Sequence, residues 1–486
     1  MRVLVSLPVL LPLLAAGCSL VLARHTTAQR LLTVVVLTAV LADAVALLVA
    51  VHRDGPARVA VGGWPPPLGI ALAADLLSAL LLTVGVLVAL AVLLFAIGQG
   101  TSERSGETAV PFHPAYLMLV GGVGLAFLTG DLFNLFVAFE VMLASSYVLI
   151  TLNAGEARVR AGMTYTMTSL TSSLLFLTAV ALVYAATGTV ALDELGRRTA
   201  GLDEGVRAAL GAFLLCVFAI KAAVVPLHFW LPDGYPTAPA PITAVFAALL
   251  TKVGVYAMIR TQAELFPRED TWWLVAGAAM LTMLVGILGA IAQDDINRLL
   301  SFTLVSHIGF MLFGLSLFDV AGFTGTILYI VHHIVVQAGL FLVTGLVVAR
   351  TGTAKLHLME PADGGPERGT PPVITALFLL PALSMAGIPP FSGFIAKFAL
   401  LRAAAAHGGV AAYAVAATAL LTSLLTLYAL LRVWRALSAP APGPPASPVL
   451  TVGATAGMVL VGLALAAGAG PLAELSERAA TDLLAR

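Results

Sequence analysis

Long apolar stretches separated by short polar segments repeat along the entire chain of 486 residues. About 20 apolar residues cross the hydrocarbon core of a bilayer, and the stretches that reach or approach this length are 3–23, 31–51, 68–97, 112–129, 131–152, 162–186, 207–228, 238–262, 272–292, 298–317, 322–349, 371–397, 409–437 and 449–470. Backbone groups in lipid must be hydrogen-bonded within the segment, and these stretches have no alternating strand pattern. The sequence therefore predicts an all-α polytopic membrane protein with about 14 transmembrane helices.

Composition supports this prediction and excludes other classes. Hydrophobic residues make up 60% of the chain and charged residues 10%, with a mean hydropathy of +1.02. A soluble protein commonly has about a quarter of its residues charged, so this chain belongs in a membrane. The net charge is zero and no basic tail is present, which argues against nucleic-acid binding. Cys18 and Cys216 lie in separate apolar stretches, so we expect neither a disulfide nor a metal site, and no cofactor.

The polar connections and the two termini add little to this picture. The longest connections, 350–371 and 438–448, predict surface linkers rather than domains. The final stretch, PLAELSERAATDLLAR, predicts a short amphipathic helix on the membrane surface. The first, MRVLVSLPVLLPLLAAGC, resembles a secretory signal, but Ala15 fits the cleavage pattern poorly and we expect it to stay as the first span. Lysine and arginine are balanced between the two sides, so charge leaves the orientation open.

Lysine and arginine occupy different places along the chain. Every arginine lies in a loop, at a terminus or near a predicted helix end, whereas Lys221, Lys252 and Lys397 lie inside apolar stretches. Arginine stays charged under almost all conditions, while a buried lysine can release its proton. A charge at mid-membrane costs about 2.5–3.5 kcal/mol, so each of these lysines needs a partner or a role. We interpret the three lysines as groups that bind and release protons along a proton path.

Glu140, at the centre of the fifth stretch, is the predicted partner of Lys221. The protonation of a Glu–Lys pair in low dielectric is coupled, so a charge that moves nearby changes which member holds the proton. The alternative is a static ion pair that fixes helix packing. Asp43 and Asp75 lie nearer predicted helix ends, where an interfacial or capping role is expected. The hydroxyl run TYTMTSLTSS (164–173) either lines water or bonds back to its own helix.

Prolines interrupt two predicted helices beside the lysines, at Pro226, Pro232, Pro236, Pro389 and Pro390. Proline has no N–H, so Pro226 leaves the carbonyl of Ala222 without its helical donor, and the last two prolines free those of Met385 and Ala386. Broken helices at membrane depth survive where they are buried or line a wet cavity. A lysine precedes the first break and another follows the second, which is the reversal expected of an inverted repeat.

Histidines lie in the sequence between these lysines, namely His228 in the first break, His307 in LVSHIGF, and His332 and His333 in LYIVHHIVVQ. Histidine is the natural proton relay near neutral pH. Neighbouring helical residues point about 100° apart, so the adjacent pair is not expected to bind one metal ion. For His307 and for the pair, the alternative is a hydrogen-bonded packing role.

Three stretches carry a resemblance to a known family: KAAVVPLHFWLPDGYPTAPAPITAVFAALLTKVGVYAMIR (221–260), DDINRLLSFTLVSHIGFM (294–311) and SMAGIPPFSGFIAKF (384–398). They resemble the antiporter-like subunits shared by respiratory Complex I, membrane-bound hydrogenases and Mrp-type cation/proton antiporters. TGDLFNLFVAFEVMLASSYVLI and LPDGYPTAP are most similar to the D-type subunits of Mrp antiporters, since Complex I relatives more often have alanine and histidine in place of Gly234 and Tyr235.

The resemblance implies two inverted five-helix repeats, spans 4–8 and 9–13, with broken helices 7 and 12. The implied divisions are 1–110, 111–262, 272–437 and 449–486, with both termini on the outer face. It also implies a path from the coupled pair Glu140 and Lys221 through Lys252 and a histidine at 332 or 333 to the terminal Lys397. Relatives often carry lysine in place of Asn297 and Gln337, so the eleventh span relies on histidine here.

These observations predict a proton-translocating subunit of a multi-subunit antiporter for Na⁺ or another monovalent cation, a transporter subunit rather than an enzyme. Its expected surroundings are the cell inner (cytoplasmic) membrane, its lipid and the other subunits of the complex. One alternative is the proton-pumping subunit of a redox complex, an NADH-quinone oxidoreductase or a membrane-bound hydrogenase. Its redox chemistry would belong to partners, because the sequence has no flavin, haem or iron–sulfur motif. A second alternative is a non-conducting scaffold.

Overall fold

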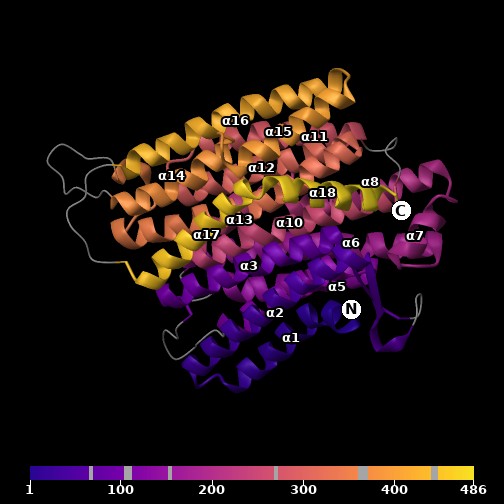
Figure 1. Cartoon of the computed structure of the whole chain (residues 1–486), viewed down its shortest axis with the longest axis horizontal. Coiled ribbons are helices and arrows are strands. Elements are labelled where there is room, and N and C mark those ends of the chain that lie inside the picture. The colour runs from indigo at the N-terminus through magenta and orange to yellow at the C-terminus, as the bar shows by residue number, and fades with distance from the viewer. Residues whose placement is uncertain are drawn as a thin grey trace.

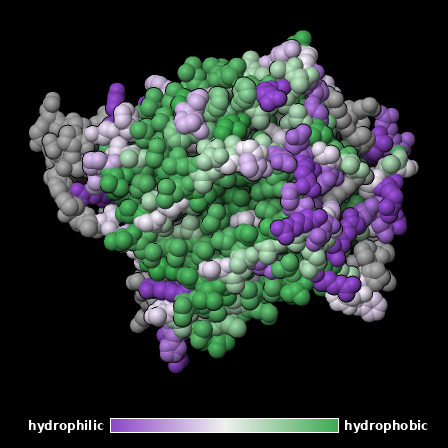
Figure 2. Space-filling view, viewed as in Figure 1, coloured by the Kyte–Doolittle hydropathy of each residue, from purple (hydrophilic) through white to green (hydrophobic). Residues whose placement is uncertain are grey.

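The computed structural model describes residues 1–64, 69–102, 112–151, 156–266, 272–359, 370–438 and 447–485. Within these ranges nearly every residue is helical, which confirms the predicted all-α class. The long helices run side by side in one direction (Figure 1). Figure 2 shows a broad apolar surface along them, with hydrophilic residues gathered toward the end that carries α7 (Leu192–Thr199). This distribution is that of a membrane-embedded bundle.

The elements follow one another in four groups. The first contains α1 (Arg2–Val21), α2 (Thr26–Asp54), β1 (Ala57–Ala60), η1 (Val61–Gly63), β2 (Ala71–Ala74) and α3 (Leu76–Gln99). The second contains α4 (Phe112–Leu128), α5 (Leu132–Ile150), α6 (Glu156–Thr187), α7, α8 (Glu204–Ala222), α9 (Trp230–Gly234), η2 (Tyr235–Thr237) and α10 (Ala240–Glu264). The third contains α11 (Trp272–Ile291), α12 (Ile296–Leu317), α13 (Val320–Thr351), η4 (Leu356–Leu358), α14 (Pro372–Ala386), α15 (Ser392–His407) and α16 (Val410–Leu437). The last contains α17 (Val449–Ala467) and α18 (Ala469–Leu484).

Twelve of the described helices are long and apolar enough to cross a membrane. The apolar helices α4 and α14 are shorter, at 17 and 15 residues. The predicted twelfth span, 371–397, is divided between α14 and α15. Length and hydropathy therefore do not confirm the predicted count of fourteen, although every predicted span overlaps a described helix.

A two-stranded hairpin at one end of the bundle was not predicted. β1 pairs antiparallel with β2, and Leu72 in β2 also pairs with Thr129. The third span therefore begins at Leu76 rather than near residue 68, because residues 71–74 are extended. An ion pair between Arg58 and Asp193 joins the hairpin to α7. The two strands, ARVA and ALAA, are mostly alanine, and a single valine is all they have of the β-branched and aromatic residues that signal a strand in a sequence.

The same loop arrangement occurs at the start of α5 and of α12. Asp131 caps α5 and Asp295 caps α12, each through its own side chain. Backbone hydrogen bonds then join the loop to the segment after the following long helix. Before α5, they link Leu132 with Val190 and Gly130 with Leu192. Before α12, they link Ile296 with Ala354 and Asp294 with Leu356. Each residue of the second set lies the same number of positions after its counterpart. This recurrence supports two structural repeats; their inverted relation and the predicted divisions stay predictions.

Both predicted breaks are present, and they follow the same spacing. α8 ends at Ala222 with Ala223 in the left-handed region at φ 60°, and α14 ends at Ala386 with Gly387 at φ 88°. The seventh span is therefore shorter than the predicted 207–228. Pro232 and Pro236 do not break the chain further, because they lie in the short helices α9 and η2, where a missing N–H in the first turn costs no hydrogen bond.

The C-terminal segment forms a helix, α18, as predicted. α18 packs against α13, α3 and α10, and its buried residues are Ser476, Ala479, Ala480 and Leu483. The helix lies along the bundle (Figure 1). Neighbouring helices thus contact the mostly small side chains of its buried face, and the predicted position on the membrane surface stays a prediction.

Candidate functional site

Three central helices carry most of the predicted proton path. α10 and α13 are buried over their whole membrane-length windows, and α12 is buried over 94% of its window. They carry Lys252, His307, His332 and His333, and each of these side chains is at most 2% exposed. The ionisable groups therefore lie among protein helices rather than against lipid.

Lys221, at the end of α8, contacts α6 and α5. Its Nζ donates to Ser173 Oγ at 2.9 Å and to the carbonyl of Ser169 at 3.4 Å. It also lies 5.3 Å from the ring centroid of Phe139, the residue before Glu140. Within the described ranges these hydrogen bonds direct the side chain to α6 and away from the freed carbonyl of Ala222.

Glu140 does not form a direct ion pair with Lys221 within the described ranges. Its Oε1 is buried and has no hydrogen-bond partner, while the residue as a whole is partly exposed on α5. The predicted proximity of the two residues is supported through Phe139. The direct contact is not formed, because hydroxyl and carbonyl groups of α6 occupy the lysine, and the electrostatic coupling stays a prediction.

A small cavity adjoins Lys221. Its volume is about 30 Å³, and its lining residues include the hydroxyl-bearing Tyr165, Thr168, Ser169 and Ser172. A cavity needs about 10–15 Å³ to hold a water molecule, so this one has room for one or two. Part of the predicted hydroxyl run thus lines a water-sized space, whereas Thr164 and Thr171 bond back to α6.

Lys252 follows on the next helix. α8 and α10 are closely packed, because a Cβ at Gly254 would lie 2.8 Å from the backbone nitrogen of Ala222. This contact lies within one turn of both Lys221 and Lys252. The Nζ of Lys252 donates to the carbonyl of Ala247 at 2.5 Å, and the side chain is fully buried. Close packing therefore brings the segments that carry the first two lysines together.

A cluster of aromatic and imidazole rings surrounds Tyr329 of α13. Its hydroxyl is 2.7 Å from Nδ1 of His307, and its ring centroid lies 5.8 Å from that of His332 and 6.2 Å from that of His333. The rings of His307 and His333 are 5.4 Å apart. Both nitrogens of His333 are buried without a hydrogen-bond partner. The structure thus brings together three of the four predicted histidines around a tyrosine that the sequence analysis missed.

Lys397 closes this series on α15. Its Nζ donates to the carbonyls of Met385 and Ala386 at 2.9 and 3.1 Å, the two carbonyls predicted to be freed by Pro389 and Pro390. It lies 4.7 Å from the ring centroid of Phe310, which stacks on Tyr329. Ser392, at the start of α15, is 2.9 Å from Nδ1 of His332. The break therefore supplies both the acceptors for Lys397 and a hydroxyl for the histidine.

Two residues singled out in the sequence lie outside this cluster. His228 is half-buried in the first break, and its ring contact is with Phe302 at 6.4 Å; among the described residues, no hydrogen bond or ring contact joins it to the other histidines. Gln337 donates to the carbonyl of Leu300 at 3.1 Å, while its Oε1 is buried without a partner. Gln337 thus occupies the eleventh span as a neutral, partly bonded amide.

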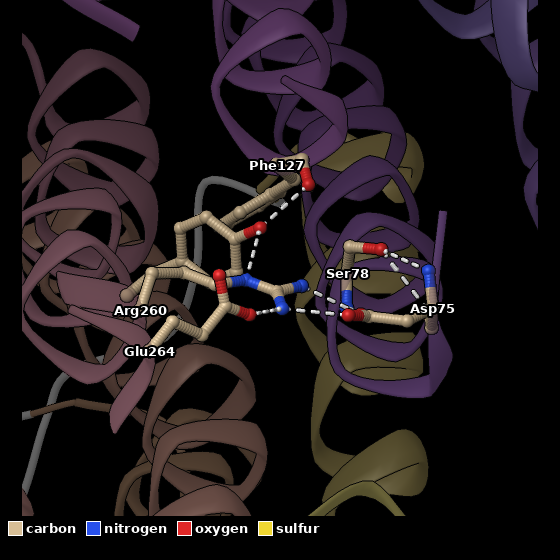
Figure 3. Close-up of polar contacts among 6 residues, drawn as sticks. Asp75, Ser78, Phe127, Arg260 and Glu264 are labelled. Atoms are coloured by element: carbon tan, nitrogen blue, oxygen red, sulfur yellow. Dashed lines mark hydrogen bonds and ion pairs between the residues drawn. The ribbon is translucent and has the colours of Figure 1, made fainter. Parts of the chain in front are cut away.

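The two aspartates singled out in the sequence differ in their surroundings. Asp75 caps α3 through a reciprocal pair of bonds with Ser78, which confirms its capping role. It also forms a buried ion pair with Arg260 that was not predicted (Figure 3). Asp43 lies inside α2, which continues to Asp54, so its predicted place near a helix end is wrong. Spacing along α10 could have pointed to Arg260, because Lys252, Tyr256, Arg260 and Glu264 follow one another every four residues.

The fold and this site define a class. Within the described residues, no group of three or more His, Cys, Asp or Glu side chains is arranged to hold a metal ion. Instead, lysines and histidines are buried in series across a bundle of membrane-length helices, and charged groups inside a membrane mark ion and proton pathways. The protein is a polytopic helical membrane protein with a series of ionisable side chains in its interior.

Comparison with known proteins gives the family. Residues 129–426 match the family described as NADH:quinone oxidoreductase/Mrp antiporter, TM, and the chain belongs to this family. It is 39% identical over 437 residues to the D-type subunit of the Na(+)/H(+) antiporter of Alkalihalophilus pseudofirmus, and the match covers 89% of this chain and 86% of the relative. The protein of the same name from Bacillus subtilis is 34% identical over 433 residues, covering 88% and 86%. The predicted resemblance is confirmed.

Solved structures agree. A chain of the Mrp complex from Dietzia sp. superimposes with a TM-score of 0.91 at 33% identity, covering 100% of this chain and 98% of that one. A chain of respiratory complex I from Thermus thermophilus superimposes with a TM-score of 0.82 at 26% identity, covering 99% of each. The chain is therefore an antiporter-like membrane subunit of a kind found in multi-subunit complexes.

Proposed function

We propose that this chain is the proton-translocating subunit of a multi-subunit antiporter that exchanges protons for Na⁺ or another monovalent cation. Protons move along Glu140, Lys221 and Lys252 in the first half and along the histidine cluster and Lys397 in the second. The protein acts in the cell inner membrane together with other subunits, and it carries no redox chemistry of its own.

The observation that carries this proposal is the series of buried ionisable side chains across five helices. Lys221 adjoins a water-sized cavity, the helices of Lys221 and Lys252 are in close contact, and Lys397 lies against the same aromatic cluster as His307 and His332. A lysine or histidine that changes its charge alters the proton affinity of its neighbours, so protons can move in steps along such a series.

The second candidate, a proton-pumping subunit of a redox complex, is favoured by the similarity to respiratory complex I. The antiporter is preferred because the similarity to the Mrp complex is greater in both identity and TM-score. The relatives named as D-type subunits of Na(+)/H(+) antiporters support the same choice.

The purified complex, with all its subunits, reconstituted into lipid vesicles tests this proposal. We expect an imposed Na⁺ gradient to drive proton movement, measured with an internal pH-sensitive dye, in the absence of any electron donor. Proton movement that requires an electron donor would favour the redox pump. Unchanged exchange in an assembled complex that carries Lys221→Ala, Lys252→Ala and Lys397→Ala together would favour the scaffold.

A further inference from the structure

The face of α10 that carries Lys252 continues as a line of polar side chains toward one end of the bundle. Tyr256, Arg260 and Glu264 follow Lys252 at four-residue intervals, which places them along one side of the helix. Lys252, Tyr256 and Arg260 are 0%, 2% and 6% exposed, so this line runs through the protein interior. An open polar line of this kind would connect Lys252 with the aqueous phase at the end of the bundle.

Arg260 crosses this line and joins three helices (Figure 3). Its Nη2 and Nη1 contact the two carboxylate oxygens of Asp75, at the start of α3, each at 2.6 Å. Nη1 also donates to Glu264 Oε1 at 2.8 Å, and Nε donates to the Tyr256 hydroxyl at 2.9 Å. That hydroxyl donates in turn to the carbonyl of Phe127, at the end of α4, at 2.8 Å.

The chemistry of this contact differs from that of the proposed proton path. A guanidinium stays protonated, so it does not pass a proton on by releasing one. A fixed arginine charge in a narrow polar passage raises the electrostatic barrier to protons and cations. Two-pronged bonding to a carboxylate also fixes the orientation of the planar group. Arg260 therefore blocks the line both by its charge and by filling the space between α10 and α3.

Polypeptide covers the same end of the bundle. Asp75 directly follows β2 of the hairpin. A Cβ at Gly196 in α7 would lie 2.9 Å from the carbonyl oxygen of Glu264, and Thr199 Oγ1 donates to the carbonyl of Leu265 at 3.0 Å. The hairpin and α7 thus pack closely beside the arginine and its carboxylates.

We propose that Arg260, held by Asp75 and Glu264, is a seal that prevents ions from leaking between Lys252 and the aqueous phase at the end of the bundle that carries α7. The inference rests on the proposed function, because it takes Lys252 as part of the proton path. With this end closed, protons that reach Lys252 leave only along the series of ionisable groups, and their movement stays coupled to that of the cation.

Passive proton leak tests the seal. Vesicles that contain the complete complex are given a pH gradient without any Na⁺ gradient, and the decay of that gradient is followed. In Arg260→Gln, Asp75 and Glu264 remain in the line without their fixed cation and can relay protons. We expect the leak to rise about tenfold or more, which corresponds to about 1.4 kcal/mol of barrier removed. The matched control is Arg432→Gln: Arg432 lies near the end of α16 and donates to the carbonyl of Ile291, and its leak should stay at the wild-type level.

A second variant shows which path the leak takes. In Lys252→Ala/Arg260→Gln the leak should fall back toward the wild-type level, because the line no longer reaches a group that accepts protons. A wild-type leak in the assembled Arg260→Gln complex, or a raised leak that persists in the double variant, would overturn the seal. If Arg260→Gln does not assemble, Arg260→Lys is tested instead. It keeps the positive charge but loses the two-pronged bond to Asp75. A modest rise in leak then supports the seal, and a wild-type leak contradicts it.

The same preparation separates this inference from the proposed function. Na⁺-driven exchange that survives Lys252→Ala would contradict the proton path whatever the leak of the arginine variants. If Lys252→Ala abolishes exchange but Arg260→Gln leaks no more than the wild type, the proposed function stands and only the proposed seal is contradicted.

Discussion

Equivalent positions in the two halves of the molecule carry different chemistry. Tyr165, Thr168, Ser169 and Ser173 in α6 have the same spacing from the recurring loop bonds as Tyr329, His332, His333 and Gln337 in α13. Each tyrosine hydroxyl bonds a neighbouring helix at 2.7 Å, Tyr165 to Ser146 and Tyr329 to His307.

On the proposed proton path, this difference affects how protons move in each half. Hydroxyl groups donate and accept hydrogen bonds but do not change their charge near neutral pH, so the first half depends on water and on Lys221 and Glu140. Imidazole changes its charge in that range, so the second half can hold a proton on its own side chains. In the proposed mechanism, the two halves thus have the same helical arrangement, with hydroxyl groups and water in the first and titratable side chains in the second.

The largest expected effect concerns the charged pair of the first half. Glu140→Ala and Lys221→Ala should each abolish Na⁺-driven proton exchange in vesicles, because among the described residues that line the cavity only Lys221 changes its charge readily, and Glu140 is its proposed partner. Co-purification of the partner subunits checks assembly, and Glu477→Ala, on the exposed face of α18, is the control. Near-normal exchange in either variant would remove the pair from the mechanism, and lost assembly would favour a static packing role.

The second prediction concerns the histidines of the second half. His332→Ala/His333→Ala should stop exchange, because it removes the two titratable side chains of α13 that are proposed to carry protons between Lys252 and Lys397. The rate is measured across a range of pH, with His357→Ala in the exposed loop as the control. Retained activity with an unchanged pH profile would show that the relay uses other groups.

The third prediction restores a charge to the same helix. Gln337 lies one turn after His333 on α13, where it is fully buried and donates to the carbonyl of Leu300. Gln337→Lys, added to the double histidine variant, should recover part of the exchange rate. A complete absence of recovery in an assembled complex would mean that the position of the imidazole, and not only a titratable group, is required.

The smallest expected effect concerns a hydroxyl of the first half. Ser173→Ala removes a hydrogen bond to Lys221, and hydrogen bonds to charged groups contribute about 1.5–3 kcal/mol. Water in the adjoining cavity can replace part of this contact, so we expect exchange to slow severalfold without being lost. Thr178→Ala is the control, because Thr178 bonds to Leu174 of its own helix. Complete loss in Ser173→Ala would show that the cavity water does not take over the contact.

The sequence predicted features that depend on residues near one another in the chain, and it missed contacts between residues that are far apart in the chain. That the carbonyls of Met385 and Ala386 lose their helical donors was predicted from two nearby prolines, and Lys397 donates to both. Asp75 and Arg260 are 185 residues apart, and no local pattern joins them. The direct Glu140–Lys221 pair was predicted from charge alone, yet a nearby hydroxyl takes the lysine. Tyr329 was missed because a tyrosine in an apolar helix has no distinctive spacing.

The most direct test of the proton path compares two lysines of the same chain. Lys252 is fully buried at the centre of the proposed path, whereas Lys355 lies exposed in the loop after α13. Na⁺-driven proton movement is measured in vesicles with equal amounts of complex that carry Lys252→Ala or Lys355→Ala. We predict that the first variant loses exchange while the second keeps the wild-type rate. Equal rates in the two assembled variants would contradict a path through this subunit.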